Sequence, residues 1–208
     1  VGFGHSIIVG SFASDAAHRC LDLFATNKTA GTPLNAGIGG TWLTNFNSTT
    51  DNGRDRFQTA ILGSNKREFL VLMYLINEAR TTAGFGPVSA TTDWLPDARE
   101  TLNGLIQGGY PPSKILISDD CWVTDSRLAN TDPDQTRVTY ETFVTAAQQV
   151  AAEYGTHRAL TYEYMRDNGG DALIDGGDTP PLHPGDTGHA AIATTFSAAT
   201  MLDTGRVS

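Results

Sequence analysis

Two side chains near opposite ends of this chain could together carry out acyl transfer. Ser6 lies in GHSIIVG, residues 4–10, and His183 lies in LHPGDTGH, residues 182–189. Ester cleavage through an acyl-enzyme needs a nucleophile, a base that takes its proton, and hydrogen-bond donors for the tetrahedral oxyanion. Ser6 is the candidate nucleophile. His183 is the candidate base, because imidazole titrates close to neutral pH.

Candidate donors for the oxyanion come from the backbone and from one amide side chain. NAGIGG, residues 35–40, ends in a glycine pair, and Asn77 follows an apolar run. Glycine lets the backbone approach a reacting carbon closely, so a glycine of this pair could supply one N–H. The N–H of Ser6, at an expected helix start, and the Asn77 amide would supply the others. Taken singly, Asn77 is more simply a turn residue and His183 a loop histidine.

Strands and helices alternate between these residues. Apolar stretches predict strands at 1–3, 69–76, 114–118 and 158–165, with an extended stretch at 33–38. Apolar spacings of three and four predict helices over 12–24, from Asp93 to the GYPPS stretch at 109–113, from Thr139 to Gly155, and over about 187–201. This order predicts the α/β class: a three-layer α/β/α sandwich with a parallel, doubly wound (flavodoxin-like) sheet. Ligands bind beyond the carboxyl ends of such strands, where these motifs fall.

Length and charge limit the organisation and the partners. The 208 residues predict a single domain over 1–208. The net charge of −9 disfavours nucleic acid and anionic membranes as partners. The longest apolar run, residues 69–76, is far too short to span a membrane, and no signal peptide is visible. We expect a mature form or part of a longer polypeptide; its location is not fixed, with a slight preference for an extracellular one.

The two cysteines and the histidines form no metal-binding pattern. Cys20 and Cys121 are read first as reduced, buried side chains, and a disulfide between them is the alternative. No spacing of cysteines and histidines matches a zinc site. The sequence therefore predicts no metal and no cofactor.

The motifs, taken in order, resemble the SGNH hydrolase family, also called GDSL-type esterases. The family pattern is GDS with a glycine four residues after the serine, then a turn such as NxxIxG, then GxND, then DxxHP. The resemblance covers essentially the whole chain and implies a serine esterase. The matching positions are Ser6, Gly10, Gly40 (or Gly39, one residue earlier), Asn77, His183, and the Gly188-His189 pair that resembles the start of the family's last helix.

The acid of the expected triad departs from the family pattern. The family's usual acid lies three residues before the histidine, where this chain has Pro180. Asp178 is the nearest carboxylate and the favoured acid, and Asp175 lies further away. A backbone carbonyl could instead orient His183, which would leave a dyad of serine and histidine.

Two other motifs are also altered. His5 replaces the family's aspartate, and Leu75 and Glu78 flank Asn77 where the family has glycine and aspartate. His5 is expected to support the turn rather than to transfer protons. An aspartate at this position is therefore expected to be tolerated.

Three residues are candidates for a substrate-binding rim: His5, Asp119 and Trp42. Asp119 and its neighbour Asp120 follow a predicted strand, and they could instead cap the next turn. Trp42 suits a sugar face, and buried packing is the equal alternative.

The favoured function is hydrolysis of an ester, above all an O-acetyl group on a carbohydrate, through an acyl-enzyme on Ser6. The partner would be a small-molecule or carbohydrate ester. A lipid esterase or thioesterase is the second enzymatic reading. The rival is a non-catalytic carbohydrate-binding or assembly module on the same fold, which the altered GDS motif and Pro180 would favour. The joint presence of Ser6, Asn77 and His183 argues for the enzyme.

Overall fold

The computed structural model describes residues 1–45, 51–79, 88–131 and 136–200. Within these residues one parallel sheet runs in the order β1 (Gly2–Gly4), β2 (Leu70–Met73), β3 (Ile115–Ser118) and β4 (His157–Ala159). Outside β1, residues 34–38 run alongside through a parallel bridge between Gly2 and Asn35. That edge, which the sequence predicts as extended, completes the flavodoxin-like order.

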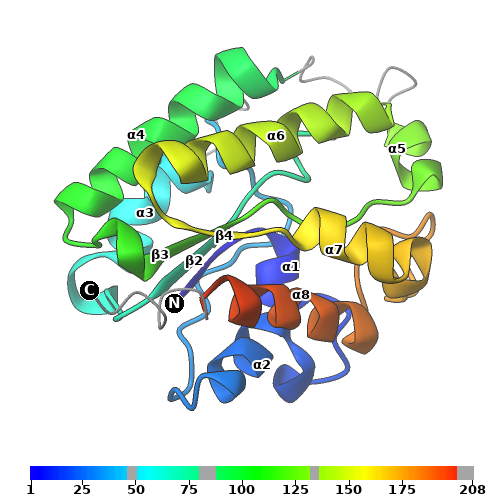
Figure 1. Ribbon diagram of the computed structural model, residues 1–208, viewed down its shortest axis with the longest axis horizontal. Coiled ribbons are helices and arrows are strands. Elements are labelled where there is room, and N and C mark those ends of the chain that lie inside the picture. Colours follow the sequence, from blue (N-terminus) through cyan, green and yellow to red (C-terminus); the bar gives the residue numbers. More distant parts are fainter. Residues whose placement is uncertain (46–50, 80–87, 132–135, 201–208) are drawn as a thin grey trace.

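Helices cover both faces of the sheet, as Figure 1 shows. On one face lie α3 (Gly53–Ile61), α4 (Leu95–Gln107) and α6 (Arg137–Tyr154), and on the other α2 (Cys20–Asn27) and α8 (Asp186–Ala199). Three shorter helices lie beyond strand ends: α1 (Ser6–Val9), α5 (Asp125–Thr131) and α7 (Thr161–Asn168). The predicted three-layer α/β/α sandwich is therefore confirmed. None of the helices described is long and apolar enough to cross a membrane.

Strands β2 and β3 are buried along their whole length, as their unbroken apolar sequences predict. The end of β1 lies so close to β2 that a Cβ at position 4 would collide with the carbonyl oxygen of Met73. Gly4 therefore allows the close strand approach directly before Ser6.

The helix predicted over 12–24 is wrong in its first half. Residues Ala16–His18 form only a short 3-10 turn, and the α-helix begins at Cys20. Phe12 has a φ of +68° and Arg19 is extended, so no continuous right-handed helix can pass through either residue. Only the second half of the predicted apolar face, from Cys20 onward, is therefore helical.

The strand predicted over 158–165 is also wrong beyond Ala159, since α7 begins at Thr161. The Asp119 carboxylate accepts hydrogen bonds from the N–H groups of Thr161 and Tyr162, which starts this helix. That cap comes from 42 residues earlier in the chain, so local sequence does not reveal it.

Other predicted elements agree apart from their ends. The ladder of β2 stops at Met73, three residues before the predicted end, although residues 74–76 remain buried. Helix α6 begins at Arg137 rather than Thr139, and Gly155 closes it with a φ of +64°. The expected end of the last helix at Met201 lies outside the described residues.

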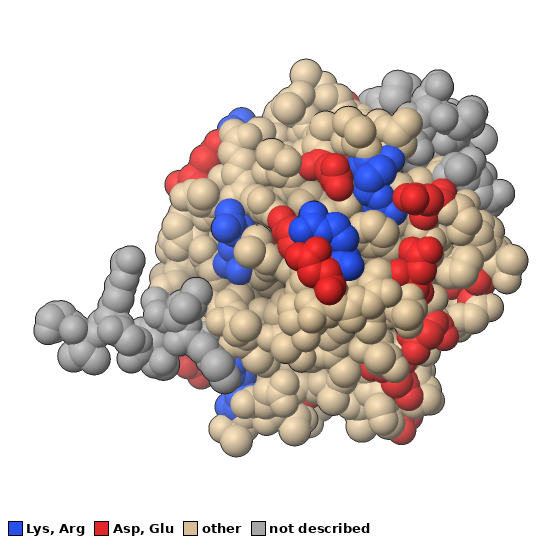
Figure 2. Space-filling model, turned by 45° about the vertical axis from the view of Figure 1, so that its right-hand side comes forward, with Lys and Arg blue, Asp and Glu red and all other residues tan. Residues whose placement is uncertain are grey.

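Cys20 and Cys121 are both buried and free, so the reduced reading is confirmed. Burial raises the pKa of the Cys20 thiol to about 12 and that of the Cys121 thiol well above its ordinary value. On the face shown in Figure 2, acidic and basic side chains are interspersed, and acidic groups run down one side. This face presents no broad basic surface among the residues described.

Candidate active site

The candidate nucleophile lies on a tight turn directly after β1. Ser6 is the first residue of α1, and the His5 ring at the N-cap accepts the N–H of Ile7 through Nδ1 at 3.3 Å. Gly10 ends the turn with a φ of +86°. Since α1 is only one turn long, the helix dipole expected from the sequence contributes little. The donor that Ser6 offers is its own N–H, which has no intrahelical partner.

The candidate nucleophile, base and acid form one line of contacts. Ser6 Oγ lies 2.9 Å from His183 Nε2, and His183 Nδ1 lies 3.0 Å from Asp178 Oδ2. Asp178 Oδ1 accepts the backbone N–H groups of Leu182 and His183, each at 3.1 Å. Asp175, the alternative acid, instead accepts the N–H of Gly185 at 2.6 Å.

The charge of Asp178 fixes which imidazole nitrogen carries the proton. Partial burial acts to raise the pKa of Asp178, but hydrogen bonds from two backbone N–H groups and the imidazole outweigh it and hold that pKa below its ordinary value. The ionised carboxylate accepts only, so it selects the tautomer of His183 with its proton on Nδ1. Nε2 is then left as an acceptor for the Ser6 proton.

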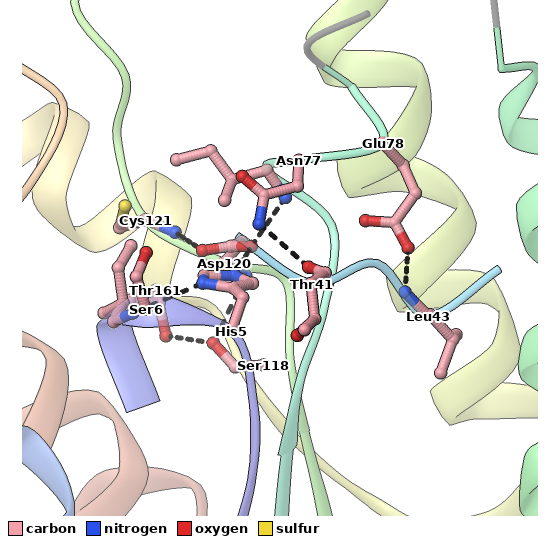
Figure 3. Close-up of polar contacts among 12 residues, drawn as sticks. His5, Ser6, Thr41, Leu43, Asn77, Glu78, Ser118, Asp120, Cys121 and Thr161 are labelled. Atoms are coloured by element: carbon pink, nitrogen blue, oxygen red, sulfur yellow. Dashed lines mark hydrogen bonds and ion pairs between the residues drawn. The ribbon is translucent and has the colours of Figure 1, made fainter. Parts of the chain in front are cut away.

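The candidate oxyanion donors lie beside Ser6. Gly40 has a φ of +73°, in the left-handed region that glycine adopts readily, and a Cβ at the alternative Gly39 would lie 3.8 Å from Ser6 Cβ. Asn77 donates one amide hydrogen to the Thr41 carbonyl at 2.8 Å, as Figure 3 shows. An amide group has two such hydrogens, so one remains for a ligand. The same bond fixes the 40–41 turn to the end of β2.

A cavity of about 360 Å³ opens over these groups. Its described lining residues are Ser6, Ser11, Gly40, Trp42, Asn77, Arg127, Leu182 and His183. A larger cavity, about 650 Å³, lies at the amino end of the strands near Val1 and Phe69 and contains none of the candidate catalytic residues. Of these two cavities, only the smaller one is lined by the candidate catalytic residues.

Comparison with solved structures reveals the same architecture over nearly the whole chain. A protein from Parabacteroides merdae described as a putative GDSL-like lipase superposes with a TM-score of 0.74 and 18% identity, covering 97% of this chain and 94% of the other. The chain has the fold of the GDSL-type (SGNH) hydrolases. A lipase/acylhydrolase from Enterococcus faecalis gives a TM-score of 0.66 at 18% identity, with 95% and 92% covered. A variant of an acetyl xylan esterase from Geobacillus stearothermophilus gives 0.64 at 16% identity, with 96% and 92% covered.

These likenesses establish the fold, and activity has to be argued from the site. No family model matches the sequence, and no curated protein sequence matches it. The comparison of three-dimensional structures therefore supports, at the level of the fold, the resemblance of the motifs to the SGNH pattern.

Glu78, at the aspartate position of the SGNH motif GxND, supports the loop that carries the oxyanion donors. Its Oε1 accepts the N–H groups of Leu43 and Thr44, and the side chain is 1% exposed. Burial raises the pKa of Glu78 to about 7, although the hydrogen bonds from the backbone oppose the shift. Glu78 and Asn77 thus hold the same loop from neighbouring positions.

Two of the three expected rim residues do not reach substrate. His5 and Asp119 are buried, at 0% and 1% exposure, and neither lines the cavity. Asp119 caps α7, which begins 42 residues later, and not the turn that directly follows it, where its alternative role is expected from the sequence. Burial, followed by the neighbouring Glu163 carboxylate, raises the pKa of Asp119 well above its ordinary value. Trp42 is 4% exposed and lines the cavity, so this side chain both packs in the core and forms part of the cavity wall.

Two residues beside the candidate triad are not predicted from the sequence. The Phe12 ring stacks on the His183 ring with centroids 4.9 Å apart and planes inclined by 20°. Arg127, on α5, lines the cavity and donates from Nη1 to the carbonyl of Pro180 at 3.1 Å. Phe12 lies within a wrongly predicted helix, and no helix is predicted at α5, so the sequence offers no local signal for either.

Within the described ranges, no group of three or more His, Cys, Asp or Glu side chains is arranged to hold a metal ion.

Proposed function

We propose that this protein is a serine esterase that works through an acyl-enzyme on Ser6. The observation that carries the proposal is the continuous line from Ser6 Oγ to His183 Nε2 at 2.9 Å and from His183 Nδ1 to Asp178 at 3.0 Å. These distances lie within hydrogen-bond reach for a nucleophile, its base and the group that orients the base.

The first half-reaction forms the acyl-enzyme. Ser6 Oγ attacks the ester carbonyl carbon while His183 Nε2 takes the hydroxyl proton. The N–H groups of Ser6 and Gly40 and the second amide hydrogen of Asn77 stabilise the negative charge on the carbonyl oxygen. When the tetrahedral intermediate collapses, the bond to the leaving oxygen breaks and His183 returns the proton to the departing alcohol.

The second half-reaction regenerates the enzyme. Water attacks the acyl carbon and loses a proton to His183, which then protonates Ser6 Oγ as the acid departs. Throughout both steps the Asp178 carboxylate stabilises the imidazolium and keeps its orientation. No other proton carrier is required.

The favoured substrate is an acetyl ester on a carbohydrate. The cavity is small, and Ser11, Asn77 and Arg127 give its wall hydrogen-bonding groups suited to sugar hydroxyls. An acetyl xylan esterase is among the proteins of similar fold. A long acyl chain, as in the substrate of a lipid esterase, would need a long apolar channel. This cavity, with a volume of about 360 Å³, is small for such a chain.

A matched panel of esters tests this substrate class. Initial rates are measured on p-nitrophenyl acetate, butyrate and decanoate, on an acetylated xylooligosaccharide and on an acyl thioester. We expect acetyl esters to give the highest kcat/KM and the sugar acetate to release acetate. A preference for decanoate or for the thioester would overturn the carbohydrate proposal, and the absence of any turnover would favour the non-catalytic module.

A further inference from the structure

A buried pair of titratable side chains lies behind the nucleophile, outside the cavity. His5 Nε2 is 2.7 Å from Asp120 Oδ2, and both side chains are 0% exposed. Figure 3 shows this pair beneath Asn77 and next to Ser6. Neither residue can touch a substrate, so the esterase mechanism above does not use them directly.

Every polar atom of the pair has an identified partner. His5 Nδ1 accepts the N–H of Ile7, so the neutral ring carries its proton on Nε2 and donates it to Asp120. Asp120 Oδ2 also accepts the N–H of Ile76 at 2.8 Å, and Oδ1 accepts the N–H of Cys121 at 2.9 Å. The backbone of Asp120 is held at a φ of +70°, in the left-handed region that non-glycine residues seldom adopt.

One oxygen of Asp120 thereby joins the two segments that bear the reacting groups. His5 directly precedes Ser6, and Ile76 directly precedes Asn77. The ladder between β1 and β2 ends at the pair Gly4 and Met73, so strand hydrogen bonds no longer set the spacing of these segments. Asp120 Oδ2 replaces the ladder at that point.

We propose that Asp120, acting with His5, is a positioning residue that sets the placement of Ser6 relative to Asn77. This inference rests on the proposed esterase function. If Ser6 shifts relative to Asn77, the transition state is stabilised less and kcat falls. The cavity wall is largely unchanged, so ground-state binding of the substrate, and with it KM, changes little.

The pair also accounts for histidine at position 5. Asp120 requires a donor from this position and Ile7 requires an acceptor, and a neutral imidazole supplies both. An aspartate would accept the N–H of Ile7 but would face the Asp120 carboxylate in a buried site, where two like charges cannot both ionise. The sequence-based expectation that His5→Asp is tolerated is therefore reversed by the presence of Asp120.

Removal and restoration of the donor at position 5 test the proposal. His5→Asp and His5→Asn keep an acceptor for Ile7 but are too short to reach Asp120, whereas the longer His5→Gln places an amide donor near the position of the histidine Nε2. Values of kcat and KM are measured on p-nitrophenyl acetate for these variants and for Asp120→Asn, with melting temperatures measured in parallel. His5→Asp, His5→Asn and Asp120→Asn are each expected to lower kcat by about tenfold or more with KM within about twofold, and His5→Gln is expected to retain most of the wild-type kcat.

Asp119→Asn is the matched control, because Asp119 is equally buried one residue away but contacts α7 instead of His5 or Ile76. It is expected to change the melting temperature and to leave kcat within about twofold. If Asp120→Asn does not fold, the comparison of His5→Asn with His5→Gln takes its place, because both variants keep Asp120 and differ in whether the side chain at position 5 reaches it.

Two results would overturn the inference: a lower melting temperature with unchanged kcat in Asp120→Asn, or a His5→Gln variant no faster than His5→Asn. Either result leaves the esterase proposal intact as long as the wild-type protein turns over ester. If the wild-type protein neither hydrolyses any ester nor reacts at Ser6, the proposed function fails, and the positioning role falls with it.

Discussion

Asp178 Oδ2 contacts His183 Nδ1 at 3.0 Å although the two residues are five positions apart. The loop between them turns so that Asp178 Oδ1 also accepts the N–H groups of Leu182 and His183 itself. Arg127 holds the outer side of this loop through the Pro180 carbonyl. A carboxylate thus reaches the imidazole without standing three residues before it, as the SGNH pattern would require.

Asp178→Asn is expected to lower kcat by about 10²- to 10⁴-fold, because the neutral amide no longer stabilises the imidazolium or selects its tautomer. Without the carboxylate the charged ring is less favoured, so the acid limb of the kcat/KM profile should move to lower pH. Rates measured across the acid and neutral pH range report both effects. Asp175→Asn is the control and should stay within about tenfold of the wild-type rate; the reverse ranking would assign the acid to Asp175.

Asn77→Ala is expected to lower kcat by about 10²- to 10³-fold, the usual loss for one oxyanion donor, with a much smaller change in KM. Steady-state kinetics on p-nitrophenyl acetate measure the two constants separately. Asn65→Ala serves as the control, because the Asn65 side chain donates to the Thr59 carbonyl and does not line the cavity. An unchanged kcat in Asn77→Ala would show that Asn77 does not stabilise the oxyanion and only holds the loop at Thr41.

Phe12 combines a strained backbone with a ring stacked on His183, the proposed base, and its side chain is 49% exposed. Phe12→Ala and Phe12→Gly both remove the ring and should lower kcat to a similar extent. The glycine variant should be more stable than the alanine variant by about 1 kcal/mol, because a φ of +68° is unfavourable for alanine. Urea unfolding measures the difference, and equal stabilities would show that the loop relaxes.

Glu78 makes folding stability depend on pH. Its pKa rises from 4.5 to about 7 on folding, so its contribution is fully present below about pH 4.5 and is lost as pH rises through 7. The unfolding free energy of the wild-type protein relative to Glu78→Gln should therefore fall across this window, by an amount on the order of 3 kcal/mol. Urea unfolding of both proteins across this range tests the sign. A constant difference would contradict the raised pKa.

The sequence predicts most of the fold because its strands are short apolar runs and its helices have clear apolar faces. The order of Ser6, Asn77 and His183 along the chain also indicates which strand ends would meet. The predictions that are wrong fall where contacts between distant segments determine the local structure. Asp119 starts α7 where the local pattern predicts a strand, and Phe12, which stacks on His183, has a positive φ at the first residue of the expected helix.

The role of His5 shows the same limit within the site. Its partner Asp120 lies 115 residues later in the chain, so the chemical reason for histidine at this position is visible only in three dimensions. Asp178, the carboxylate nearest to His183 in the sequence, also contacts it in three dimensions, because both residues belong to one short loop.

The most direct measurement of the central claim is covalent labelling by a fluorophosphonate, followed by mass spectrometry of the intact protein and its peptides. We expect one adduct, located on Ser6, that forms at the same rate at which p-nitrophenyl acetate hydrolysis is lost. In Ser6→Ala we expect neither labelling nor turnover, with an unchanged melting temperature. An adduct on another serine, or full esterase activity in Ser6→Ala, would contradict the claim.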